Sequence, residues 1–215
     1  FLNNFQTAFK PQLIQLYASG RRDDFDQLVI NSSKLSLFLL LLIVAPLMLQ
    51  MESVLGWWLG SEVQIPEYTA QFCRLILAFL LIDALSSSLL LSAQAIGDIK
   101  RYQLVVCSIQ LAILPIAYLL LRMGYSPQLV LLLRVGLNVL CYGYRVYYLH
   151  SRIEFCVRRY LVQTLLPSVV VCGVVLTLGL YLYQPGMVSV VTALWRSLLL
   201  LLAICVSVWS VGLTK

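Results

Sequence analysis

Six apolar runs of about 20 residues or more dominate this sequence and constrain its fold more than any other feature. They cover residues 34–55, 68–96, 102–121, 128–149, 161–183 and 188–213. A helix rises about 1.5 Å per residue, so each run is long enough to cross the hydrocarbon core of a bilayer. Only 11% of the residues are charged, whereas a soluble domain has about 25%. The sequence therefore predicts an all-α, polytopic transmembrane helix bundle with six full spans.

The first 18 residues form a further, amphipathic segment that is too short and too polar to cross a bilayer alone. Its apolar residues, among them Phe5, Phe9 and Leu13, recur at helical spacing between polar ones. One interpretation is a helix on the membrane surface, and the other is the cytoplasmic end of a truncated spanning helix. We favour the second, and because the sequence begins with Phe1 instead of Met, we expect a piece of a longer protein.

Basic residues alternate between the loops and predict the orientation of the chain. Segments 19–33, 97–101 and 150–160 carry Lys and Arg, whereas the loops between them carry Glu52, Glu62 and Glu67 and a single basic residue, Arg122. By the positive-inside rule the basic segments are cytoplasmic, and so is the C-terminus at Lys215. The predicted organisation is a truncated helix end (1–18), a cytoplasmic loop (19–33), four spans (34–149), a second cytoplasmic loop (150–160) and a final pair of spans (161–215).

Three arginines, Arg74, Arg134 and Arg196, fall inside the spans at a common depth. Counted from the outer ends of their spans, all three lie roughly 9 to 12 Å deep. An ionised side chain at the bilayer centre costs at least about 2.5 kcal/mol, so each one needs water or a partner. These guanidinium groups could extend to the lipid headgroups, or they could line a cavity that attracts an anionic substrate such as a phosphate.

Polar residues share a helical face with two of these arginines. Arg134, Asn138, Cys141 and Arg145 lie within about 40° of one another at 100° per residue. Arg196 lies on a similar stripe of serine and threonine residues. A polar stripe on a membrane helix faces either a neighbouring helix or a water-filled cavity, so Arg134, Asn138, Arg196 and Arg74 are the candidate substrate-binding residues.

Asp83 lies about 22 Å below the outer end of its span, too deep to extend to the headgroups. It therefore needs a partner, a proton or a water-filled cavity. On an ideal helix it points away from Arg74 and shares a face with Ser87 and Gln94. Either the face of Asp83 or the opposite face of Arg74 is expected to serve helix packing. Asp83 is the candidate residue for coupling to an ion or a proton.

Motifs of soluble enzymes and metal sites are missing from the sequence. The six cysteines have no Cys-x-x-Cys spacing, and the single histidine, His150, lies among basic residues. We therefore expect no catalytic residue, no cofactor and no metal site. The basic loops are explained by topology and by attraction to membrane lipids, so we expect no nucleic-acid partner.

Several segments resemble a known family of membrane transporters. They are NNFQTAFKPQLIQLYASGRRDDFDQLVINSSKLSLFLLLL (3–42), WWLG (57–60), PEYTAQFCRL (66–75) and IGDIKRYQ (96–103). The chain resembles the polysaccharide and O-antigen flippases, or lipopolysaccharide biosynthesis proteins, of the multidrug/oligosaccharidyl-lipid/polysaccharide exporter superfamily. The resemblance implies the C-terminal half of a two-lobed transporter, in which residues 1–18 end a truncated helix, the next four spans complete the lobe and the last two are an additional pair.

The resemblance also implies a function and its partners. The expected activity is the flipping of undecaprenyl-pyrophosphate-linked oligosaccharides from the cytoplasmic to the periplasmic leaflet of the bacterial inner membrane. The partners would be this anionic lipid-linked substrate, membrane lipids and an N-terminal lobe of the same chain. An antiporter of drugs or other cations with the same fold, a membrane-embedded glycan ligase or polymerase, and a membrane scaffold subunit remain as alternatives.

Overall fold

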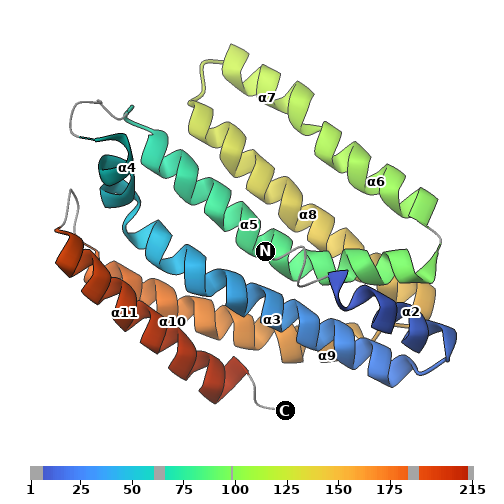
Figure 1. Ribbon diagram of the computed structural model, residues 1–215. Coiled ribbons are helices and arrows are strands. Elements are labelled where there is room, and N and C mark those ends of the chain that lie inside the picture. Colours follow the sequence, from blue (N-terminus) through green and yellow to red (C-terminus); the bar gives the residue numbers. More distant parts are fainter. Residues whose placement is uncertain (1–6, 61–65, 98, 184–188, 213–215) are drawn as a thin grey trace.

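The computed structural model describes residues 7–60, 66–97, 99–183 and 189–212 (Figure 1). Within these ranges the chain forms helices and no strands, which confirms the expected all-α fold. The elements are α2 (Lys10–Ala18), α3 (Arg22–Leu49), α4 (Met51–Leu59), α5 (Thr69–Ile96), α6 (Ile99–Leu111), α7 (Ile113–Arg122), α8 (Pro127–Ile153), α9 (Val157–Tyr160), η1 (Leu161–Leu165), α10 (Leu166–Leu182), α11 (Val190–Ser207) and η2 (Val208–Gly212), where η marks a π-helical turn.

Six helices among the described residues are long and apolar enough to cross a membrane, as the sequence predicted. They are Arg22–Leu49, Thr69–Ile96, Ile99–Arg122, Pro127–Ile153, Val157–Leu182 and Val190–Ser210. The third joins α6 to α7, the fifth joins α9, η1 and α10, and the sixth joins α11 to the start of η2. The chain is therefore a multi-pass membrane protein.

The segment 19–33, expected to be a loop, is helical from Arg22 onward. Asp23 and Asp24 lie in the first turn of α3, where carboxylates interact favourably with the helix dipole. Phe25, Val29 and Ile30 are buried against the neighbouring helices. The polar residues of this stretch are therefore one face of an amphipathic helix, and only residues 19–21 connect α2 to α3.

The first span also ends earlier than expected, at Leu49 instead of residue 55. Gln50 leaves the helical conformation, with φ −109° and ψ 22°, and the chain continues as the short helix α4. The side-chain Nε2 of Gln50 donates hydrogen bonds to the carbonyl of Ala193 (2.7 Å) and to Oγ of Ser197 (2.8 Å). These bonds attach the end of α3 to α11 and account for the change of direction there.

Two proline residues mark irregular turns inside the later spans. Pro115 has no N–H and its ring crowds the carbonyl of Leu111, and α6 ends at Leu111 while α7 begins at Ile113. Pro167 likewise cannot donate to the carbonyl of Gln163, and the preceding residues form the π-helical turn η1.

The expected cytoplasmic loop at residues 150–160 is mostly helical. α8 continues to Ile153, and α9 begins at Val157. Glu154 adopts a left-handed conformation (φ 57°), and its N–H donates to the carbonyl of His150 (3.1 Å). This arrangement closes α8 and leaves only residues 154–156 as a turn.

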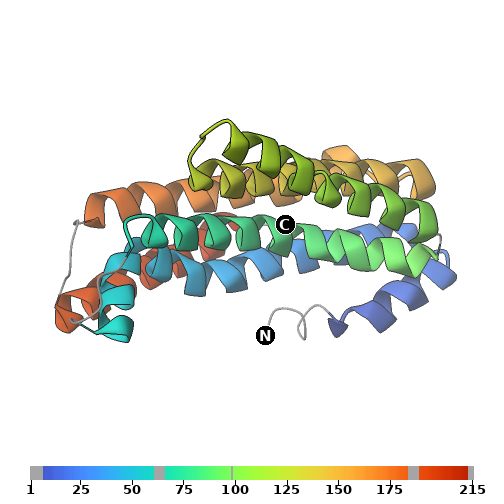
Figure 2. The same cartoon turned by 90° about the horizontal axis from the view of Figure 1, so that it is seen from above.

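The helices lie side by side with α3 and α5 in the middle (Figure 1). α8 packs against α5, and α6 and α7 pack against α8. α10 and α11 pack against α3 on the opposite side. α2 lies across the end of the bundle where α3 begins and contacts both α3 and α5, with Leu13 buried (Figure 2). The remainder of the expected helix end, residues 1–6, lies outside the described residues.

Candidate functional site

The polar stripe of α8 faces α5, one of the two arrangements that the sequence allowed. Asn138 is buried, and its Nδ2 donates to the carbonyl of Phe79 on α5 (3.2 Å). Arg145 is also buried, and its Nη1 donates to Oγ of Ser86, which like Phe79 lies on α5. The sequence spacing therefore identified a real polar seam between these two spanning helices.

Arg134 lies at one end of this seam, beside a small cavity. Its guanidinium carbon is 4.8 Å from the centre of the Phe79 ring, a cation–π contact. The cavity has a volume of about 240 Å³ and is lined by Phe79, Gln110, Ile113, Arg134, Leu137 and Asn138. Arg134 is exposed, and no carboxylate among the described residues pairs with it.

Asp83 has the charged partner that its depth in the membrane requires. Its Oδ1 is 4.0 Å from Nη1 of Arg145, and the two side chains are 47% and 6% exposed. The pair joins α5 to α8 in the same seam, two turns further along α8 than Asn138. The sequence placed Arg145 on the stripe without assigning it this role, which only the packing of α8 on α5 reveals.

Arg74 is engaged in a separate cluster at the opposite edge of α5. Its Nε donates to the carbonyl of Met48 (3.1 Å) and its Nη2 to Oε1 of Glu52 (3.2 Å). The guanidinium also lies 5.6 Å from the centre of the Tyr183 ring, and the Tyr183 hydroxyl donates to Glu52 (3.1 Å). This cluster connects α3, α4 and α5 with the end of α10 and neutralises the charge of Arg74.

Arg196 lies on α11, half-buried. α11 packs against α3 and α10, while α8 lies on the far side of α5 (Figure 1). The structure thus separates the three arginines: Arg134 shares a cavity with Asn138, Arg74 binds Glu52, and Arg196 lies across the bundle. The common depth predicted from sequence does not bring them together, because depth fixes a position along a helix and not the face of the bundle.

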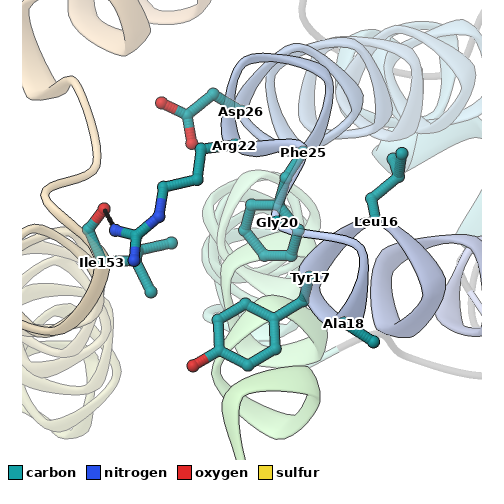
Figure 3. A pocket seen from close by; sticks show the side chains of 8 residues that line it. All are labelled: Leu16, Tyr17, Ala18, Gly20, Arg22, Phe25, Asp26 and Ile153. Atoms are coloured by element: carbon teal, nitrogen blue, oxygen red, sulfur yellow. Dashed lines mark hydrogen bonds between the residues drawn. The ribbon is translucent and has the colours of Figure 1, made fainter.

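A second cavity lies at the end of the bundle where α2, α3 and α8 meet. Its volume is about 330 Å³, and its lining residues are Leu16, Tyr17, Ala18, Gly20, Arg22, Phe25, Asp26 and Ile153 (Figure 3). Nη1 of Arg22 donates to the carbonyl of Ile153 (2.8 Å), and the rings of Tyr17 and Phe25 are 6.1 Å apart. The sequence did not indicate this cavity, because seven of its eight lining residues fall within residues 16–26, which carry no motif, and Ile153 joins them only through packing.

Comparisons with known proteins identify no relative. Models of known families, curated proteins and solved structures all gave no match to this chain. The fold alone defines the class, a multi-pass α-helical membrane protein.

Proposed function

We propose that this chain belongs to a transporter that flips lipid-linked oligosaccharides across the bacterial inner membrane. The substrate class is an undecaprenyl-pyrophosphate-linked oligosaccharide, which moves from the cytoplasmic to the periplasmic leaflet. The observation that carries this proposal is the Arg134 guanidinium, which lines a cavity between spanning helices without a carboxylate partner among the described residues. Transport without bond cleavage is the expected activity, so no residue has a catalytic role.

The cavity suits part of an anionic headgroup. A guanidinium offers several N–H donors in a planar arrangement that matches phosphate oxygens. Asn138 and Gln110 add amide groups on the same cavity wall. A cavity of about 240 Å³ accommodates a phosphate or diphosphate and leaves the sugars and the lipid tail outside it.

The other candidate residues receive different roles in this proposal. Arg74 is held by Glu52 and Met48, so it positions the outer ends of the helices instead of binding the headgroup. Arg196 lies on the α11 side of the bundle, away from the Arg134 cavity, so it does not bind the headgroup there. Asp83 remains a candidate for ion coupling only if its pairing with Arg145 breaks during transport.

A drug or cation antiporter is the second candidate, favoured by the half-exposed carboxylate of Asp83. A cationic substrate would require Asp83 in its binding site and would be repelled by Arg134. The two candidates therefore predict opposite consequences for the same pair of variants, Arg134→Ala and Asp83→Asn.

The test uses the full-length gene in a bacterial strain that lacks its own O-unit flippase. We expect the wild-type protein to restore surface polysaccharide and Arg134→Ala to reduce it about tenfold or more, because one charge-assisted contact contributes about 1.5 to 3 kcal/mol. Arg122→Ala is the matched control, since Arg122 is an exposed arginine at the end of α7. Membrane abundance is measured for every variant.

Two outcomes contradict parts of the proposal. If Arg134→Ala restores polysaccharide as well as Arg122→Ala does, the flipping activity stands but Arg134 does not bind the substrate. If Asp83→Asn abolishes drug resistance in a hypersensitive strain while Arg134→Ala has no effect on any polysaccharide, the antiporter is the correct function.

A further inference from the structure

Lys34 occupies an unusual position for a lysine in a membrane protein. Because α3 begins at Arg22, Lys34 lies twelve residues along the helix, about 18 Å from its start. The sequence had suggested a position at the cytoplasmic edge of the first span. Lys34 is only 8% exposed in the structure. It is therefore a buried amine inside a spanning helix.

The surroundings of Lys34 follow from its face on α3. At 100° per residue, Lys34 lies within about 40° of both Gln27 and Phe38. Gln27 accepts a hydrogen bond from Arg159 on α9 (2.7 Å), and Phe38 packs in the apolar cluster that contains Val171 of α10. Lys34 lies between these two levels, so it faces the π-helical turn η1 and the start of α10.

The side chains at this level are polar but uncharged. Thr164 of η1 and Ser168 of α10 are buried on the face that carries Val171, and neither hydroxyl has a hydrogen-bond partner among the described residues. Ser207 of α11 is also buried, one turn beyond Ile204 of the same apolar cluster. Both neighbouring spans contain a π-helical turn at this end, η1 and η2, and such turns often occur at functional sites.

Charged and titratable groups on the elements packed against α3 do not compensate Lys34. They are Lys10 and Tyr17 (α2), Glu52 (α4), Cys73, Arg74 and Asp83 (α5), Arg158, Arg159 and Tyr160 (α9), Cys172 and Tyr181 (α10), and Arg196 and Cys205 (α11). The two carboxylates in this set are engaged elsewhere, Glu52 with Arg74 and Asp83 with Arg145. In the part of the chain that the structure describes, Lys34 forms no ion pair.

We propose that Lys34 is a proton-binding site that takes up and releases a proton during the transport cycle. A buried ammonium without a counter-charge is unstable in a membrane protein, whereas a neutral amine is tolerated there. No cavity for a larger ion is required, because water supplies the proton to the amine nitrogen and accepts it again. Toward the start of α3, Nε2 of Gln27 donates to Oδ1 of Asn31 (3.1 Å), and Arg159 contacts both Gln27 and Asp23.

The coupling role rests on the proposed transport function, but proton binding by Lys34 does not. Its first test is thermal unfolding of the purified full-length protein in detergent, from about pH 6 to about pH 9. If the unfolded chain binds the proton more readily than the fold does, stability rises with pH. We expect this rise in wild type and its reduction in Lys34→Met, whose midpoint should exceed that of wild type at low pH.

Lys100→Met is the matched control, because Lys100 is exposed near the start of α6. It should follow the wild-type curve at every pH. Lys34→Gln serves as the second variant if Lys34→Met does not fold. The proposal is overturned if the folded Lys34 variant follows the wild-type curve throughout this pH range.

The second test separates coupling from transport itself. The full-length protein is reconstituted in liposomes with a fluorescent undecaprenyl-pyrophosphate-linked oligosaccharide, and flipping is measured with and without an imposed pH gradient. We expect the gradient to accelerate flipping by wild type and Lys100→Met, but not by Lys34→Met or the permanently charged Lys34→Arg.

Each result of the second test has a distinct meaning. Acceleration of both Lys34 variants overturns the coupling role of Lys34. If wild type flips no substrate, the proposed transport function fails, and the thermal measurement alone decides whether Lys34 binds a proton.

Discussion

At the scale of single residues, charge compensation distinguishes the ionised groups inside the spans. Arg74 binds Glu52, and Arg145 lies beside Asp83. Arg134 and Lys34 have no carboxylate partner among the described residues. Because lipid solvates charge poorly, a compensated pair can be structural, whereas an uncompensated group needs water, a ligand or loss of its proton. This distinction separates the positioning residues from the candidate binding residues.

The pair of Asp83 and Arg145 gives a prediction about stability. Asp83→Asn removes the negative charge next to a guanidinium that is only 6% exposed. We expect the free energy of unfolding to fall by about 1 kcal/mol, because the buried guanidinium loses the attraction of a half-exposed carboxylate 4.0 Å away. Thermal unfolding in detergent measures the change.

Asp24→Asn is the control for this prediction, since the ion pair of Asp24 with Arg21 is well exposed. Exposed pairs contribute little, so this variant should unfold close to the wild-type midpoint. Equal midpoints for Asp83→Asn and Asp24→Asn would mean that the Asp83–Arg145 contact does not stabilise the helix pair.

At the scale of helices, side-chain hydrogen bonds determine where the first span ends. Apolar content continues past Leu49, so composition alone places the end at residue 55. The bonds from Gln50 to α11 instead fix a break between α3 and α4. The start of the same helix also differs from expectation, because the charged residues after Arg22 form the polar face of a helix whose other face is buried.

Gln50→Leu tests the role of this break. The variant removes both hydrogen bonds to α11 and leaves the Ala193 carbonyl without its Gln50 donor, so we expect a loss of about 1 to 3 kcal/mol in stability. Gln103→Leu is the control, because Gln103 is exposed on α6. A midpoint of thermal unfolding that changes equally in both variants would show that the Gln50 bonds do not hold α11 in place.

At the scale of the whole molecule, the distribution of basic residues predicts the orientation in the membrane. Cys156 is exposed in the turn between α8 and α9, on the side predicted to be cytoplasmic. Met123 is 70% exposed in the turn between α7 and α8, on the predicted outer side. These two positions lie at opposite ends of the same spanning helix, so they report its direction.

Cysteine labelling in cells measures this orientation. The full-length protein carries either Cys156 alone or Met123→Cys alone, with the other cysteines replaced. We expect a membrane-impermeant maleimide to label Met123→Cys in intact cells, and Cys156 only after the membrane is opened, because the positive-inside rule places it in the cytoplasm. Labelling of Cys156 alone in intact cells would invert the predicted topology.

The candidate site was predictable in part. The spacing of Arg134, Asn138 and Arg145 identified one polar face of α8, and in the structure Asn138 and Arg145 on this face bond to α5. The cavity beside Arg134 also requires Phe79 and Gln110, which come from two other helices. No sequence pattern joins these residues, so the cavity could be found only from their packing.

The sequence alone determined that the chain lies in a membrane and has six spans, because the length of an apolar run and its content of charged residues can be read directly from the sequence. The tertiary structure decided which helices are neighbours and therefore which charges meet. It paired Arg74 with Glu52 and Asp83 with Arg145, and it buried Lys34 without an ion pair among the described residues. The physical reason is that helical periodicity fixes the face of a residue on its own helix, whereas the partner on that face depends on the packing of distant segments.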